Sequence, residues 1–95
     1  MVAWAVFDQK DVKVTKGQPK MRASSDYGRR YFCPECGAGL LYTSEEYLPG
    51  LSDVQTATLD EPDRIGAPSA QVQMADRIGW MANAHALPAF DRYPG

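Results

Sequence analysis

The chain is poor in the residues that most often bind metals or act as catalytic nucleophiles. Its 95 residues include two cysteines, Cys33 and Cys36, and one histidine, His85. No serine or cysteine has an obvious histidine partner, so a nucleophilic site of the Ser-His or Cys-His kind is not indicated. A glycine-rich phosphate-binding loop is also missing. The sequence therefore assigns no catalytic residue.

Long hydrophobic runs are missing as well. No apolar run approaches the ~20 residues that a membrane-spanning helix needs, and the chain does not open with the pattern of a secretory leader. We therefore expect a soluble, cytoplasmic protein with no membrane partner. In a reducing compartment, two cysteines separated by two residues are expected to bind a metal rather than to form a disulfide.

The charge is small overall but unevenly distributed. The net charge is -2, so no general attraction to nucleic acid is expected. Residues 1–32 hold seven Lys or Arg and three Asp or Glu, whereas residues 33–95 hold three and nine. Two interpretations are open: opposite faces of one domain attract each other, or the basic half holds an anion site. Arg29 and Arg30, followed by Tyr31 and Phe32, fit either a basic-aromatic patch or an ordinary strand with alternating faces.

The length and the turn signals predict one all-β domain over residues 1–95. A chain of this size buries a small core, so a metal or a partner subunit would stabilise it. We expect coiled antiparallel sheets around a zinc knuckle, with few short helical turns. The pattern predicts strands at residues 2–7, 12–15, 20–24, 29–32, 40–43, 53–59 and 70–75, a loop at 44–52, a helical turn at 60–63, an ambiguous segment at 76–81 and a C-terminal strap over the body at 85–95.

The motif with chemical content is Cys33-Pro34-Glu35-Cys36-Gly37. Two thiolates at this spacing can hold one tetrahedral zinc, at Zn–S distances of about 2.3 Å. Pro34 stiffens the turn, and Gly37 permits the positive φ that such turns often need. Backbone N–H groups in the turn would point at the sulfurs. The motif predicts a zinc knuckle with Cys33 and Cys36 as metal ligands.

Two other interpretations of the cysteine pair stay open, namely a redox dithiol and two plain buried cysteines. A redox pair begins a helix, whose dipole lowers the pKa of the first thiol. Here Gly37-Ala38-Gly39 and then an apolar strand follow, which favours zinc. A structural zinc takes four ligands, and the chain has no third cysteine. His85 is a weaker candidate for a further ligand.

Four segments, in order, resemble the glutathione-dependent formaldehyde-activating enzyme family, which also includes centromere protein V. Residues 28–37 (GRRYFCPECG) resemble the second cysteine motif of that family, and residues 54–62 (VQTATLDEP) resemble its following strand and acidic turn. Residues 77–81 (RIGWM) with 84–88 (AHALP) and Phe90 resemble its closing segment. The opening 2–7 (VAWAVF) resembles a strand in the middle of the domain, so the chain matches the C-terminal two-thirds of the family domain.

The resemblance implies a β-rich fold and a structural zinc held by two early and two late cysteines, of which Cys33 and Cys36 are the late pair. It also implies a carbon–sulfur lyase chemistry, in which glutathione and formaldehyde condense to S-hydroxymethylglutathione at a second zinc. The early cysteines of both sites are missing from this sequence. Because the chain opens directly on an apolar strand at Met1, we expect the reading frame upstream to encode them.

The expected function is therefore a zinc-binding domain that resembles these lyases and lacks their catalytic cysteines. The expected partners are a second copy, whose Cys33 and Cys36 complete the zinc site, and glutathione or a glutathione adduct. The alternative is a non-catalytic binding or dimerisation module that zinc holds together.

Overall fold

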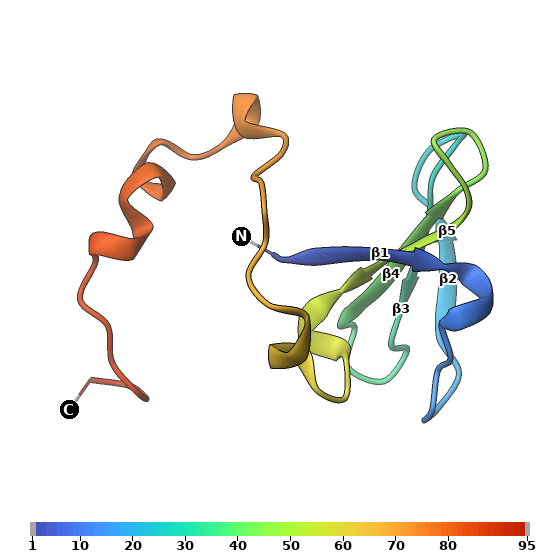
Figure 1. Ribbon diagram of the computed structural model, residues 1–95, viewed down its shortest axis with the longest axis horizontal. Coiled ribbons are helices and arrows are strands. Elements are labelled where there is room, and N and C mark those ends of the chain that lie inside the picture. Colours follow the sequence, from blue (N-terminus) through green and yellow to red (C-terminus); the bar gives the residue numbers. More distant parts are fainter. Residues whose placement is uncertain (1, 95) are drawn as a thin grey trace.

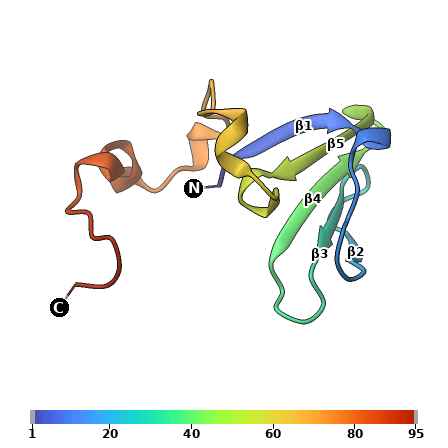
Figure 2. The ribbon, with the colours of Figure 1, turned by 60° about the horizontal axis from the view of Figure 1, so that its bottom comes forward.

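The computed structural model describes residues 2–94 and contains one antiparallel sheet of five strands (Figure 1). Predictions that concern Met1 and Gly95 lie outside the described residues. The strands follow the order β1-β5-β4-β3-β2, which Figure 2 shows along the sheet. Their bounds are β1 Trp4–Asp8, β2 Lys20–Ala23, β3 Arg29–Phe32, β4 Gly39–Ser44 and β5 Leu48–Gln55.

Strands β2 to β5 form a meander, and two serine side chains stabilise its turns. The Gly28 N–H donates to Ser25 Oγ at 3.0 Å in the β2–β3 turn, and the Tyr47 N–H donates to Ser44 Oγ at 3.2 Å in the β4–β5 turn. The rings of Tyr27 and Tyr47 meet edge to face, with centroids 4.9 Å apart. The two turns therefore lie side by side at one end of the sheet, which we call the tyrosine end.

Strand pairing defines two faces of the sheet, because successive side chains point in opposite directions. One row of directly paired residues crosses all five strands: Met21, Tyr31, Leu41, Val54 and Ala5. Three members of this row, Tyr31, Leu41 and Val54, line two cavities together with residues of the connection between β1 and β2, so residues 12–19 lie across this face. We call it the covered face and its opposite the open face.

The core is small. Val54 is the only buried hydrophobic residue of the part of the chain that the structure describes, with 5% of its surface exposed. Ser44 and Ser52 are also buried. Larger side chains of the covered face, such as Leu41 and Tyr31, are half-buried. The sheet therefore depends strongly on its hydrogen-bonded ladders.

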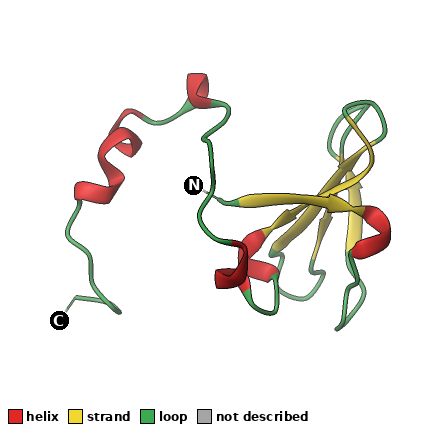
Figure 3. Cartoon of the chain, in the orientation of Figure 1, coloured by secondary structure: helices red, strands yellow, loops and turns green. Residues whose placement is uncertain are grey.

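The rest of the chain forms short 3₁₀ helices, which Figure 3 shows in red: η1 Gln9–Asp11, η2 Thr56–Thr58, η3 Pro62–Ile65, η4 Met74–Asp76 and η5 Gly79–Ala86. From about η4 onward, the chain leads away from the sheet as an extended arm (Figure 1). None of the helices among residues 2–94 has the length and apolar character of a membrane span.

The prediction of an all-β fold is confirmed. The expected strands at 2–7, 20–24, 29–32 and 40–43 correspond to β1, β2, β3 and β4, and the expected helical turn near Pro62 is η3. The cysteine turn lies at one end of the sheet, so the sheet does not wrap around it (Figure 1).

In the first two-thirds of the chain, two element predictions are wrong and a third holds only in part. Residues 12–15 form no strand. Their alternating Val12 and Val14 line the cavities of the covered face, and the segment does not pair with a strand of the sheet. The loop expected at 44–52 is wrong, because β5 passes through Pro49 and the left-handed Gly50 (φ 73°). The strand expected at 53–59 is confirmed for residues 53–55, which belong to β5, and is wrong beyond them, where η2 begins.

In the C-terminal part, residues 70–75 form no strand, and Gln73 has a left-handed backbone (φ 57°) just before η4. The expected strap at 85–95 does not cover the body: residues 85–94 are exposed on the arm.

Val54 provides a direct test of where the core lies. We expect Val54→Ala to lower the free energy of unfolding by about 1–2 kcal/mol, because two methyl groups leave a packed site. The matched control is Val6→Ala on β1, whose residue is 51% exposed on the open face. This change should stay within about 0.5 kcal/mol. Urea unfolding of both variants measures the difference, and equal losses would contradict this assignment of the core.

Candidate metal centre at the β3–β4 turn

Residues 33–38 form the tight turn between β3 and β4. The Cys33 N–H donates to the Ala38 carbonyl at 2.9 Å, and the Gly37 N–H donates to the Cys33 carbonyl at 2.7 Å. Gly37 has a φ of 79°, the left-handed region that glycine adopts without strain. A Cβ at this position would meet no atom within 4 Å, so the backbone conformation rather than crowding favours glycine. Both predictions for this turn, the tight loop and the positive φ, are confirmed.

The electrostatics of the turn favour a thiolate at Cys33. Its pKa lies below the ordinary thiol value, mainly because the backbone amide of Cys36 donates a hydrogen bond to it, with further contributions from the Glu35 amide and the Cys36 side chain. Partial burial and the Glu35 carboxylate oppose this shift. Cys33 is half-buried and Cys36 is exposed, and both are free thiols. Thiolates are the cysteine form that binds metal.

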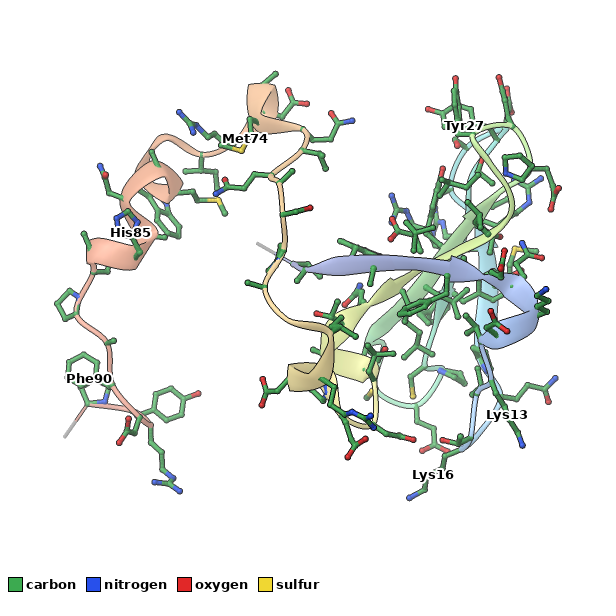
Figure 4. The ribbon with its side chains drawn as sticks, viewed as in Figure 1. Lys13, Lys16, Tyr27, Met74, His85 and Phe90 are labelled. Atoms are coloured by element: carbon green, nitrogen blue, oxygen red, sulfur yellow. The ribbon has the colours of Figure 1, made fainter. Side chains whose placement is uncertain are left out.

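The two thiols of the turn are groups that zinc binds, but they are too few for a structural zinc site. Among residues 2–94 no three His, Cys, Asp or Glu side chains gather closely enough to hold a metal ion. His85 is exposed in η5, on the arm and away from the sheet (Figure 4). One chain therefore brings together Cys33 and Cys36 but not His85, and two thiols are fewer than the four ligands of a structural zinc.

The turn does not have the geometry expected of a redox dithiol. A strand precedes Cys33, and β4 begins at Gly39, three residues after Cys36. No helix starts at the pair, so no helix dipole lowers the pKa of a thiol there. The lowered pKa of Cys33 has a local cause, the amides of its own turn.

The two arginines that precede the turn lie on opposite faces of β3. The Arg30 guanidinium stacks over the Tyr42 ring, 5.0 Å from its centroid, on the open face. Arg29 Nη1 instead donates to the carbonyls of Ser25 and Gly28, at 3.0 and 2.9 Å. Of the two interpretations of this segment, the structure therefore favours the strand with alternating faces.

Sequence reasoning missed two polar features of the sheet. Asp53 Oδ1 is buried without a hydrogen-bond partner, and burial raises the pKa of this carboxyl. Arg29 lines a cavity of about 640 Å³ under the connection between β1 and β2. The sequence signal that could have identified Asp53 was its charge, because it lies in the alternating segment expected as a strand at 53–59. The cavity had no local signal, because distant turns contribute its walls.

The reactivity of Cys33 should report its lowered pKa. In metal-free protein, alkylation of Cys33 by iodoacetamide should reach half its maximal rate at a lower pH than in the urea-unfolded chain, because only the folded turn directs amides at the thiolate. Peptide mapping by mass spectrometry follows Cys33 separately. By linkage, the stabilisation from this thiolate is present above the unfolded thiol pKa and is lost as the pH falls through the folded pKa. Coincident alkylation profiles of the folded and the urea-unfolded chain would contradict the lowered pKa of Cys33.

Comparison with known proteins gives one match. The sequence model of a family described as "Glutathione-dependent formaldehyde-activating enzyme" matches residues 1–76, most of the chain and all five strands. Comparisons with curated proteins and with solved structures gave no match. The match includes both cysteines and the turn that positions them. The chain therefore belongs to the glutathione-dependent formaldehyde-activating enzyme family.

Proposed function

We propose that this chain is a zinc-binding member of the family that recognises a glutathione adduct and supplies half of a zinc site through Cys33 and Cys36. The observation that carries the proposal is the β3–β4 turn, where two free thiols share one hydrogen-bonded loop and a lowered pKa favours the thiolate of Cys33. When bound there, zinc would link these thiolates to two further ligands.

A second copy of the chain is the proposed source of the missing ligands. A two-fold dimer places identical surfaces in contact, so two such turns can face each other and present four thiolates to one metal. The turn is suited to this contact because residues 34–38 are all exposed at the end of the sheet. Because its core is small, the chain would also gain stability by associating with a second copy.

The proposed chemistry is that of a carbon–sulfur lyase. In the condensing direction the glutathione sulfur adds to the carbonyl carbon of formaldehyde, the thiol proton ends on the carbonyl oxygen, and S-hydroxymethylglutathione results. The reverse breaks the same C–S bond. Family membership supports this substrate class. Zinc catalysis needs protein ligands and an open coordination position, and the two thiols of the turn do not provide a second such set.

The alternative is a non-catalytic dimerisation module that keeps the fold and the zinc half-site. The observation in its favour is that the part of the chain that the structure describes groups no three metal-binding side chains. The two functions differ in whether this chain recognises a glutathione adduct.

Zinc stoichiometry tests the shared site. Native mass spectrometry and metal analysis should find one zinc per dimer, and Cys33→Ser should abolish both the metal and the dimer because it removes two of four ligands. The matched control is Glu35→Gln in the same turn, which keeps both thiols and should keep both properties.

Two results would overturn the shared site. One tightly held zinc per monomer would show that one chain completes the coordination, and loss of this zinc in His85→Asn would identify His85 as a ligand. Loss of zinc in Glu35→Gln would identify a carboxylate ligand instead.

Activity is the second test. We expect the 95-residue chain, loaded with zinc, to give no measurable acceleration of glutathione–formaldehyde condensation, because a half-site leaves no catalytic centre. NMR exchange spectroscopy of the equilibrium, with and without protein, measures the rate. A clear acceleration that disappears in Cys33→Ser would show that the expectation is wrong.

A further inference from the structure

The first strand forms an unprotected edge of the sheet. β1 stands at one end of the strand order, so one side of its backbone pairs with no other strand of residues 2–94 (Figure 2). Residues 2–7 carry no charged side chain, and Val6 is 51% exposed. Proteins commonly protect an edge strand with charged side chains or proline. β1 has neither before Asp8, its last residue.

The opposite edge, β2, is protected in this way. Pro19 precedes it directly, and two of its four residues, Lys20 and Arg22, are charged. Antiparallel pairing of two such strands would bring like charges together, which is destabilising. The two edges therefore differ, since β2 disfavours a further strand and β1 is suited to one.

The hydrogen bonds of β1 show which of its backbone groups face outward. The Thr56 N–H donates to the Ala3 carbonyl at 2.9 Å, so the backbone of Ala3 faces β5. Directly opposed residues of an antiparallel pair alternate between hydrogen-bonded and non-hydrogen-bonded positions. The backbone of Ala5 therefore also faces β5, whereas the N–H and C=O groups of Trp4 and Val6 face the free edge. A further strand would pair with these outward groups.

We propose that β1 pairs antiparallel with β1 of a second copy, with Trp4 of one copy opposite Val6 of the other. In this register the two-fold axis passes beside Ala5, and each Trp4–Val6 pair exchanges both of its hydrogen bonds, so all outward groups of these residues are satisfied. An aromatic and a β-branched side chain then meet on the open face, which is a stabilising cross-strand pair. Two small Ala5 side chains meet at the axis. A second copy fits because one uncharged strand serves both sides of the contact.

This pairing goes beyond the proposed zinc contact and is compatible with it. Trp4 pairs with Gln55, whose amide occupies the space where a Cβ at Gly39 would lie. The cysteine turn, which ends at Gly39, and the start of β1 therefore lie at the same end of the sheet. Because paired β1 strands run in opposite directions, the cysteine turns of the two copies lie at opposite ends of the combined sheet. Each chain can thus contact one copy through zinc and another through β1.

Sedimentation of metal-free, full-length protein tests the pairing without the zinc contact. A contact this small is typical of weak association, so we expect dimers at about 1 mM chain and monomers in dilute solution. Val6→Pro should weaken the association about tenfold, because each copy loses an N–H donor that faces the edge rather than β5. The matched control is Met21→Pro on β2, whose N–H also faces outward, by alternation from the bond between the Ser24 N–H and the Gly28 carbonyl. It should leave the association unchanged.

Hydrogen exchange keeps the test independent of the fold of Val6→Pro. In ¹⁵N–¹H NMR of the natural, metal-free protein, exchange of the Trp4 and Val6 amides should slow as the protein concentration rises. The Met21 amide, on the other edge, should exchange at the same rate throughout.

Disulfide trapping tests the register. In protein that carries Cys33→Ser and Cys36→Ser, the further change Ala5→Cys should give a disulfide-linked dimer on mild oxidation. Directly opposed, non-hydrogen-bonded residues have Cα atoms about 4.5 Å apart, which a disulfide can span. The control Ala23→Cys, on exposed β2, should form this dimer much more slowly.

Three results would overturn the pairing: metal-free protein that stays monomeric at about 1 mM, equal effects of Val6→Pro and Met21→Pro, or slow exchange of the Trp4 and Val6 amides in a monomer. The last would show that a segment of the same chain covers the edge. Zinc-dependent dimers in which these amides exchange freely would refute this inference and leave the shared zinc site intact. Paired β1 strands in protein that binds no zinc would support it while refuting the shared site.

Discussion

The antiparallel pairing of β5 with both β1 and β4 is the interaction on which the rest of the structure depends. β5 is the longest strand, and it joins the first strand of the chain to the meander. The Thr56 N–H extends the pairing with β1 by donating to the Ala3 carbonyl at 2.9 Å. Val54, the buried hydrophobic residue, lies at the centre of this arrangement, opposite both Ala5 and Leu41.

A sheet with so little buried apolar surface needs other sources of stability. Hydrophobic burial is the main favourable term in folding, and here most large apolar side chains are half-buried or exposed. Metal binding and association with a second copy both add stability to the folded state only, by mass action. The proposed shared zinc thus combines both contributions at the turn where β3 meets β4.

The sequence predicted the local features well and the distant ones poorly. Residues 29–32 and the Cys33 turn were predictable because alternation, proline and glycine act over a few positions. The connection at 12–15 was mispredicted because Val12 and Val14 alternate as in a strand, although they pack onto a sheet instead of joining it. Likewise, Pro49 and Gly50 taken alone predict a turn. They lie within β5 instead, because β5 pairs with its neighbouring strands. The cavity around Arg29 was beyond prediction because its charged walls come from two separate turns.

The opposite directions of Arg29 and Arg30 have a consequence for how this segment can vary in evolution. Arg29 belongs to the cavity, Arg30 stacks on Tyr42, and the cysteine turn begins just after Phe32. Insertion or deletion of one residue in β3 would exchange all side chains between the two faces. It would also reorient the strand end that presents Cys33. We therefore expect β3 to accept changes of residue type more readily than changes of length, whereas the exposed arm should accept both.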